Sequence, residues 1–85
     1  MPTISIFYGI TIMMHPKGKE HNPPHVHAKY GESNASFNVN TGEMMHSSEF
    51  PLRASQMVKE FIEKNKDELL KMWENQEFIR LKGLD

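Results

Sequence analysis

The stretch from His21 to Ala28 reads His-Asn-Pro-Pro-His-Val-His-Ala and holds three of the five histidines of the chain. Histidine has an unperturbed pKa of about 6.5, so this side chain can exchange a proton near neutral pH. The two prolines stiffen the backbone beside the histidines, because each fixes its own φ at about −65° and lacks an N–H donor. This combination is typical of either a functional site or an unusual structural turn.

One interpretation of these residues is acid–base catalysis. Side chains two residues apart on a strand point the same way, roughly 6 to 7 Å apart at Cα, so His25 and His27 could flank a phosphodiester. One imidazole would take the proton of a 2′-hydroxyl, and the other would protonate the leaving oxygen. Lys29, on the same face, would stabilise the charge of the phosphorane. This pattern predicts a metal-independent ribonuclease with these three residues as its catalytic groups.

Two further interpretations use the same histidines. In one, His21, His25 and His27 bind a metal such as Zn²⁺ through neutral imidazoles. The prolines favour an extended backbone before them, which makes it harder for His21 to approach the other two histidines. No cofactor is therefore expected, and Zn²⁺ is the less favoured alternative. In the other, the ring nitrogens bond loop carbonyls and hold the Pro-Pro turn against a sheet. His15 and His46 lie outside the cluster and are interpreted as solvated or loop residues.

The elements that position these residues follow from the spacing of the apolar side chains. Alternation predicts strands, and Tyr8 and Tyr30 fall on apolar faces and are expected in the core. A later period of 3.6 residues predicts helices, with the capping-box pair Asn65 and Glu68 at a second start or a bend. Residues 78–82 alternate again and predict an edge strand or a docked tail. The predicted strands span about residues 3–14, 25–30, 34–39 and 43–46, and the predicted helices span about 52–64 and 66–76.

Together these elements predict one α+β domain over residues 1–85. Its sheet is an antiparallel meander of three to four strands, with one or two C-terminal helices packed on one face. His25, His27 and Lys29 would then project from the open face. The residues expected to bind a ligand there are His21, Asn22, Ser36 and Asn38.

The composition restricts the class of partner. The 85 residues include 10 Lys and Arg against 11 Asp and Glu, a net charge of −1, whereas a general nucleic-acid binder is basic. RNA therefore stays a candidate only through a local patch, and DNA is not indicated. The chain has no cysteine, which excludes thiolate chemistry. Its apolar N-terminal residues alternate and resemble neither a secretion signal nor a membrane span, so we expect a cytoplasmic protein without a membrane partner.

The chain resembles domain-of-unknown-function family 4160 over nearly its whole length. The resemblance rests on the opening Met-Pro-Thr-Ile-Ser, the string His-Asn-Pro-Pro-His-Val-His-Ala with the Tyr-Gly-Glu that follows, and the closing helix through Leu69-Leu70 to Trp73. It implies a small bacterial protein without an established activity, often encoded beside another small protein in an arrangement like a toxin–antitoxin module. It marks His21, Asn22, His25 and His27 as motif residues and assigns them no role.

These observations lead to two functional hypotheses. The first is a toxin-like component of a two-gene module that acts on RNA through a histidine pair. Its partner would be the small protein encoded nearby, or a second copy of itself. The alternative is a non-enzymatic protein-binding module whose histidines are structural or hold a metal. A nuclease should lose activity in His25→Ala or His27→Ala, whereas a binding module should tolerate a change to Asn or Gln that preserves hydrogen bonding.

Overall fold

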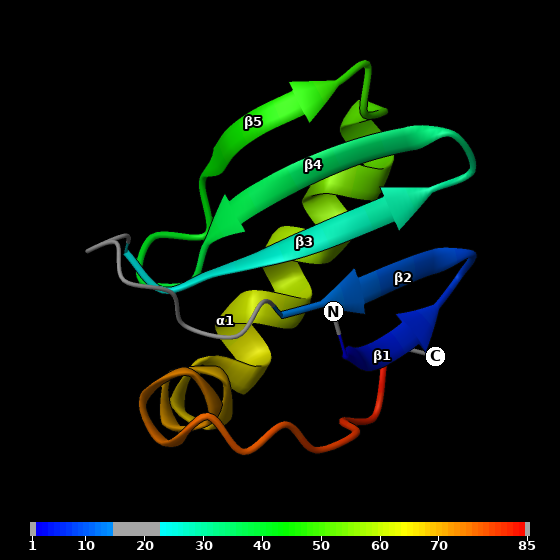
Figure 1. Cartoon of the computed structure of the whole chain (residues 1–85). Helices are drawn as coiled ribbons and strands as arrows, with labels where there is room; N and C mark the ends of the chain where they lie inside the picture. Colours follow the sequence, from blue (N-terminus) through cyan, green and yellow to red (C-terminus); the bar gives the residue numbers. More distant parts are fainter. Residues whose placement is uncertain (1, 15–22, 85) are drawn as a thin grey trace.

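The computed structural model describes residues 2–14 and 23–84, and of Ser48 it describes only the backbone. Five strands form one antiparallel sheet in chain order, and one helix lies across a face of it (Figure 1). The predicted α+β class and antiparallel meander are confirmed, but the sheet has five strands where three to four were predicted. The elements are β1 (Thr3–Phe7), β2 (Ile10–Met13), β3 (His25–Tyr30), β4 (Ser33–Asn38), β5 (Met44–Ser48) and α1 (Leu52–Asn75).

The additional strand arises from a tight turn inside the first predicted strand. Tyr8 and Gly9 have positive φ angles of 48° and 79°, as the two central residues of a type I′ hairpin turn require. Phe7 pairs with Ile10 across this turn, and both side chains are buried. Tyr8 is left 57% exposed at the turn, and Tyr30, whose ring covers Gly9, is 40% exposed. The prediction that both tyrosines belong to the core is therefore wrong.

The helix α1 covers the sheet with an apolar stripe, as the 3.6-residue spacing predicts. It is one helix bent at Asn65 (φ −118°, ψ 20°), whose side-chain amide donates to the carbonyl oxygen of Phe61 at 3.0 Å. The two predicted helices are thus the two arms of a bent helix. Phe61 stacks on Phe7 of β1 with 5.0 Å between ring centroids. The buried residues of α1 are Ala54, Val58, Phe61, Ile62, Leu69, Met72 and Trp73.

The chain beyond α1 returns to the sheet and runs beside β1, as the red end of the ribbon shows (Figure 1). Gln76 adopts the left-handed conformation that ends the helix. In the tail (residues 77–84), the N–H of Leu81 donates to the carbonyl oxygen of Ile4 at 2.6 Å. The hydroxyl of Ser5 donates to the carbonyl oxygen of Leu81 at 3.0 Å. The tail therefore docks on the outer edge of β1 without becoming a strand.

In the part of the chain that the structure describes, no helix has the length and apolar character needed to cross a membrane.

Candidate functional site

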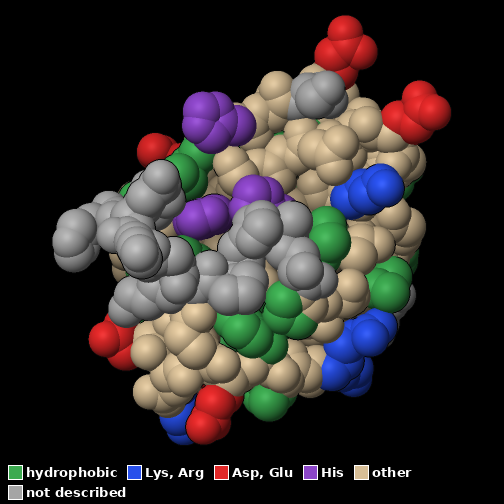
Figure 2. Space-filling model, in the orientation of Figure 1, with side chains coloured by type: hydrophobic (Ala, Val, Ile, Leu, Met, Phe, Trp, Pro, Cys, Tyr) green, Lys and Arg blue, Asp and Glu red, His purple; other side chains and the backbone are tan. Residues whose placement is uncertain are grey.

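The face of the sheet opposite α1 carries a row of side chains, one from each of four neighbouring strands. Met13 pairs with His27, His27 with Ser36, and Ser36 with His46. Residues paired across antiparallel strands point to the same face, while the next residue along β3, Ala28, is buried toward the helix. Figure 2 looks onto this open face and shows histidine side chains gathered there. The register of the meander has thus assembled residues that are far apart in the sequence.

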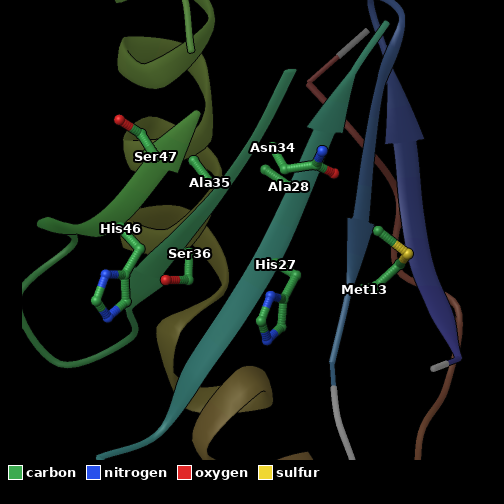
Figure 3. A pocket seen from close by; sticks show the side chains of 8 residues that line it. All are labelled: Met13, His27, Ala28, Asn34, Ala35, Ser36, His46 and Ser47. Atoms are coloured by element: carbon green, nitrogen blue, oxygen red, sulfur yellow. The ribbon is translucent and has the colours of Figure 1, made fainter. Parts of the chain in front are cut away.

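A hollow of about 390 Å³ lies over this row (Figure 3). Ser36 lies at its base, only 6% exposed. The rings of His27 and His46 lie on either side of Ser36, and two strand spacings separate their backbones by roughly 10 Å. We call this site the histidine hollow. Its lining residues, none of them acidic or basic apart from histidine, are Met13, His27, Ala28, Asn34, Ala35, Ser36, His46 and Ser47.

His25 lies at the end of the open face, in contact with His27. The two rings meet edge to face with 5.2 Å between centroids and 69° between planes. This contact leaves no room between them for a phosphodiester, so the predicted arrangement with substrate between these two rings is not present. The His25 ring also packs on Trp73 of α1, with 5.0 Å between the ring centroids.

A backbone carbonyl selects the tautomer of the neutral His25 ring. Nδ1 of His25 lies 2.9 Å from the carbonyl oxygen of Pro23, and because a carbonyl only accepts, Nδ1 carries the proton. The neighbouring carbonyl oxygen, of Pro24, accepts the N–H of Val39 at 2.9 Å. The Pro-Pro pair therefore extends the pairing of β3 with β4 and orients an imidazole. Prolines suit these positions because both residues are used only as acceptors.

Two other residues predicted for the site lie outside the hollow. Lys29 is exposed on the open face, one cross-strand row away, paired with Thr11 and Asn34. Asn38 ends β4, and its Oδ1 accepts the backbone N–H groups of residues 40 and 41 at 2.8 and 3.2 Å. Its side chain thus stabilises the turn between β4 and β5. The catalytic role expected for Lys29 stays a prediction.

His21 and Asn22, predicted to bind a ligand or a metal, lie outside the described residues. Among residues 2–14 and 23–84, no three or more side chains of His, Asp or Glu form a group that could hold a metal ion. His25 and His27 would therefore need ligands from elsewhere to form the predicted Zn²⁺ site. That site stays a prediction.

A family model described as "Domain of unknown function (DUF4160)" matches residues 9–74. The chain belongs to the DUF4160 family. The DUF4160 match spans every residue that lines the histidine hollow, together with the His-Asn-Pro-Pro-His-Val-His-Ala string. The strand β1 and the tail that covers it lie outside the match. No curated protein and no solved structure shows significant similarity to the chain.

His46 is the residue of this DUF4160 chain that sequence reasoning missed. The expectation of a solvated residue is confirmed, because His46 is exposed, but this residue lies within β5 and lines the hollow. Ser36 pairs with His46, but Phe37 pairs with Met44, so a bulge at Met45 changes the register. Counting alternate residues through the turn between β4 and β5 therefore does not place His46 on the open face. The only usable signal was its position in a predicted strand next to Ser36.

Proposed function

We propose that this DUF4160 chain is the toxin-like component of a bacterial two-gene module and cleaves RNA in the histidine hollow. The observation that supports the proposal best is the position of Ser36, only 6% exposed, between two imidazoles, those of His27 and His46. Such an arrangement offers one hydrogen-bond donor and two proton-transfer groups to a ligand in a single hollow. The separation of about 10 Å between the histidine backbones leaves room for a phosphodiester.

The proposed reaction is an internal transfer of the phosphoryl group. One of the two histidines, His27 or His46, removes the proton of a ribose 2′-hydroxyl, and the 2′-oxygen attacks phosphorus. The bond from phosphorus to the 5′-oxygen breaks, a 2′,3′-cyclic phosphate forms, and the other histidine gives a proton to the leaving 5′-oxygen. General acid–base catalysis of this kind contributes about 10²- to 10⁴-fold in rate for each group.

The other polar residues of the open face have supporting roles in the proposal. The hydroxyl of Ser36 donates a hydrogen bond to a non-bridging phosphate oxygen. Lys29 stabilises negative charge on the strand that leaves the hollow. His25 is a positioning residue, since its contacts with Trp73 and the carbonyl of Pro23 fix the ring against which His27 packs.

The charge of the site limits the class of RNA. The chain has a net charge of −1, and the hollow contains no Lys or Arg. Binding through many phosphate contacts needs a basic surface, which favours a particular RNA structure, or RNA presented by the translation machinery, over bulk RNA.

The experiment combines bacterial growth with RNA cleavage. Wild type, the double variant His27→Ala/His46→Ala and the control Thr11→Ala are expressed at matched soluble levels. Thr11 lies on the same face without lining the hollow. We expect growth arrest and 2′,3′-cyclic phosphate ends in cellular RNA with wild type and control, and a loss of about 100-fold or more in cleavage with the double variant. Equal cleavage by all three, or none by wild type, would contradict the proposal.

A specific observation favours the second hypothesis, a non-enzymatic protein-binding module. Nδ1 of His25 bonds the carbonyl oxygen of Pro23 and its ring packs on Trp73, as expected for a structural histidine. In such a module the product of the neighbouring gene would bind the open face, and His27→Asn would leave its affinity within about twofold. Isothermal titration with that purified protein measures the affinity, and the cleavage assay on the same variant distinguishes the two functions, because Asn cannot act as a general base.

A further inference from the structure

The histidine hollow has a carboxamide at one end. Asn34 precedes Ser36 by two positions on β4, so both side chains point to the open face, roughly 6 to 7 Å apart at Cα. Both residues line the hollow, and Asn34 is exposed to a ligand that enters it. Figure 3 shows Asn34 beside Ala28, at the opposite end of the hollow from the rings of His27 and His46. The proposed acid–base groups and the carboxamide therefore contact different parts of a ligand.

A hydrogen bond within β4 and the turn before it orients this carboxamide. Nδ2 of Asn34 donates to the carbonyl oxygen of Glu32 at 3.3 Å. A carboxamide has two N–H groups and one accepting oxygen, so this bond engages one donor and directs the nitrogen toward the turn between β3 and β4. The oxygen and the second N–H form an acceptor beside a donor, which is the pair of groups with which asparagine binds adenine.

The interior of the hollow suits a flat, uncharged ring. Ala28 and Ala35 pair across β3 and β4 and bury their side chains on the helix side, so the surface between Asn34 and Ser36 is low and largely backbone. The thioether of Met13 lines the same hollow, and methionine sulfur makes favourable contacts with aromatic rings. The volume of about 390 Å³ lies at the lower end of the range for small-ligand pockets, about 300–1,000 Å³, which favours a single nucleotide.

We propose that the hollow binds the base of one adenosine and that RNA is cut on the 3′ side of this nucleotide. Oδ1 of Asn34 accepts a hydrogen bond from the N6 amino group, and Nδ2 donates one to N7. The ribose and the phosphate of the same nucleotide lie at Ser36 and the two histidines. This inference rests on the proposed RNA cleavage and adds the base that the site selects. Asn34 contacts the base and not the reacting atoms, so it determines specificity.

The other bases do not match this arrangement. Guanine carries the acceptor O6 where adenine carries its N6 amino group, so two oxygens would face each other at Asn34. Pyrimidines lack N7 and fill less of the hollow. Asn34→Asp should change the preference to guanine, because a carboxylate only accepts and guanine offers its N1–H and N2–H groups side by side. The exchange of one atom group thus predicts a change of base, and not merely a loss of activity.

The first test identifies the base at the cut. Wild type, Asn34→Asp and the control Asn38→Asp are expressed in bacteria, and the 2′,3′-cyclic phosphate ends of the cellular RNA are sequenced. The control makes the same substitution outside the hollow, where a carboxylate still accepts the N–H groups of residues 40 and 41. We expect adenine at the cut about tenfold more often than any other base for wild type and control, and guanine for Asn34→Asp. Cuts without a base preference, or a preference that Asn34→Asp leaves unchanged, would overturn the inference.

The second test measures base selection without cleavage. Purified wild type and both variants are titrated with adenosine 3′-monophosphate and with guanosine 3′-monophosphate and followed by NMR. We expect the adenosine compound to shift the side-chain amide signals of Asn34 in wild type and to bind at least about fivefold more tightly than the guanosine compound. The order should reverse in Asn34→Asp and stay as in wild type in Asn38→Asp. Equal affinities in wild type, or no shift at Asn34, would contradict the adenine site.

The two tests separate this inference from the proposed function. Adenine-selective binding without cyclic phosphate ends would contradict RNA cleavage and support the base site. Cyclic phosphate ends that depend on His27 and His46 but follow no particular base would support cleavage and contradict the base site.

Discussion

Gly83 lies so close to the core that a single methyl group there should loosen the tail. A Cβ atom at this position would stand 2.5 Å from Cβ of Phe7 and 2.8 Å from its Cδ1. Phe7 cannot move away easily, because it is 1% exposed and stacks on Phe61 at 5.0 Å. Gly83→Ala therefore forces either a shift of the aromatic pair or a displacement of the tail from β1.

Both responses lower the free energy of unfolding by a similar amount. Overpacking a well-filled core costs about 1–3 kcal/mol. Lifting the tail instead gives up the two hydrogen bonds of Leu81, to Ile4 and Ser5, at about 0.5–1.5 kcal/mol each. Replacing glycine also reduces the conformational entropy of the unfolded chain, and this effect offsets about 0.4–1 kcal/mol of the loss. We expect a net loss of about 1–2 kcal/mol, and about 4–8 °C in Tm for each kcal/mol.

Urea unfolding followed by the fluorescence of Trp73 measures this loss, and hydrogen exchange at the amide of Leu81 identifies the response. Faster exchange at Leu81 with a small change elsewhere means that the tail has lifted. The control is Gly31→Ala, where φ is 61° and no atom lies within 4 Å of the added Cβ. This control should cost about 1–2 kcal/mol from backbone strain alone and leave the exchange at Leu81 unchanged.

The reasoning would be refuted if Gly83→Ala had the wild-type urea midpoint together with wild-type protection at Leu81. That result would mean that the tail does not contact Phe7 in solution. An effect of Gly31→Ala on Leu81 equal to that of Gly83→Ala would also count against it, because the exchange would then report global unfolding.

Three further substitutions test other contacts. Tyr8→Asn should raise the free energy of unfolding by about 0.5–1 kcal/mol in thermal melts, because asparagine tolerates the positive φ of 48° better than tyrosine; a loss would contradict the type I′ turn. Asn38→Ala removes the acceptor of two backbone N–H groups in the turn before β5. It should lower the free energy of unfolding in urea by about 1–2 kcal/mol, and unchanged stability would contradict this role. Ser5→Ala leaves the carbonyl oxygen of Leu81 without the hydroxyl that it accepts and should cost about 1 kcal/mol; exchange rates at the tail that match wild type would argue against this contact.

Local periodicity predicted the parts of the fold that depend on neighbours in the chain. The strand over 25–30 has the predicted bounds, because alternation in it is regular and a turn at Gly31 follows it directly. The bend at Asn65 coincides with the predicted start of a second helix. The prediction of one long first strand was wrong, because the type I′ turn at Tyr8 and Gly9 lacks the Asn-Gly or Asp-Gly pair that usually indicates such a turn.

In the candidate site, too, some positions follow from local periodicity and others only from tertiary packing. Alternation within β3 and β4 placed His27 and Ser36 on the open face, and the register pairs them there. The contact of His25 with Trp73 depends on how the bent helix crosses the end of the sheet. Such a contact joins segments that share no local pattern.

The amino-acid sequence by itself determined the class of fold, the apolar stripe of the helix and the face on which the central histidines lie, because each follows from a repeat of two or 3.6 residues. Tertiary structure decided which residues complete the hollow and which sheet edge is covered. His46 reaches Ser36 through a bulge that shifts the register of β5, and Leu81 meets Ser5 across 76 residues of sequence. Periodicity specifies which face of a strand or helix is buried, but the register of the strands and the path of the C-terminal tail are set by the packing of the whole domain.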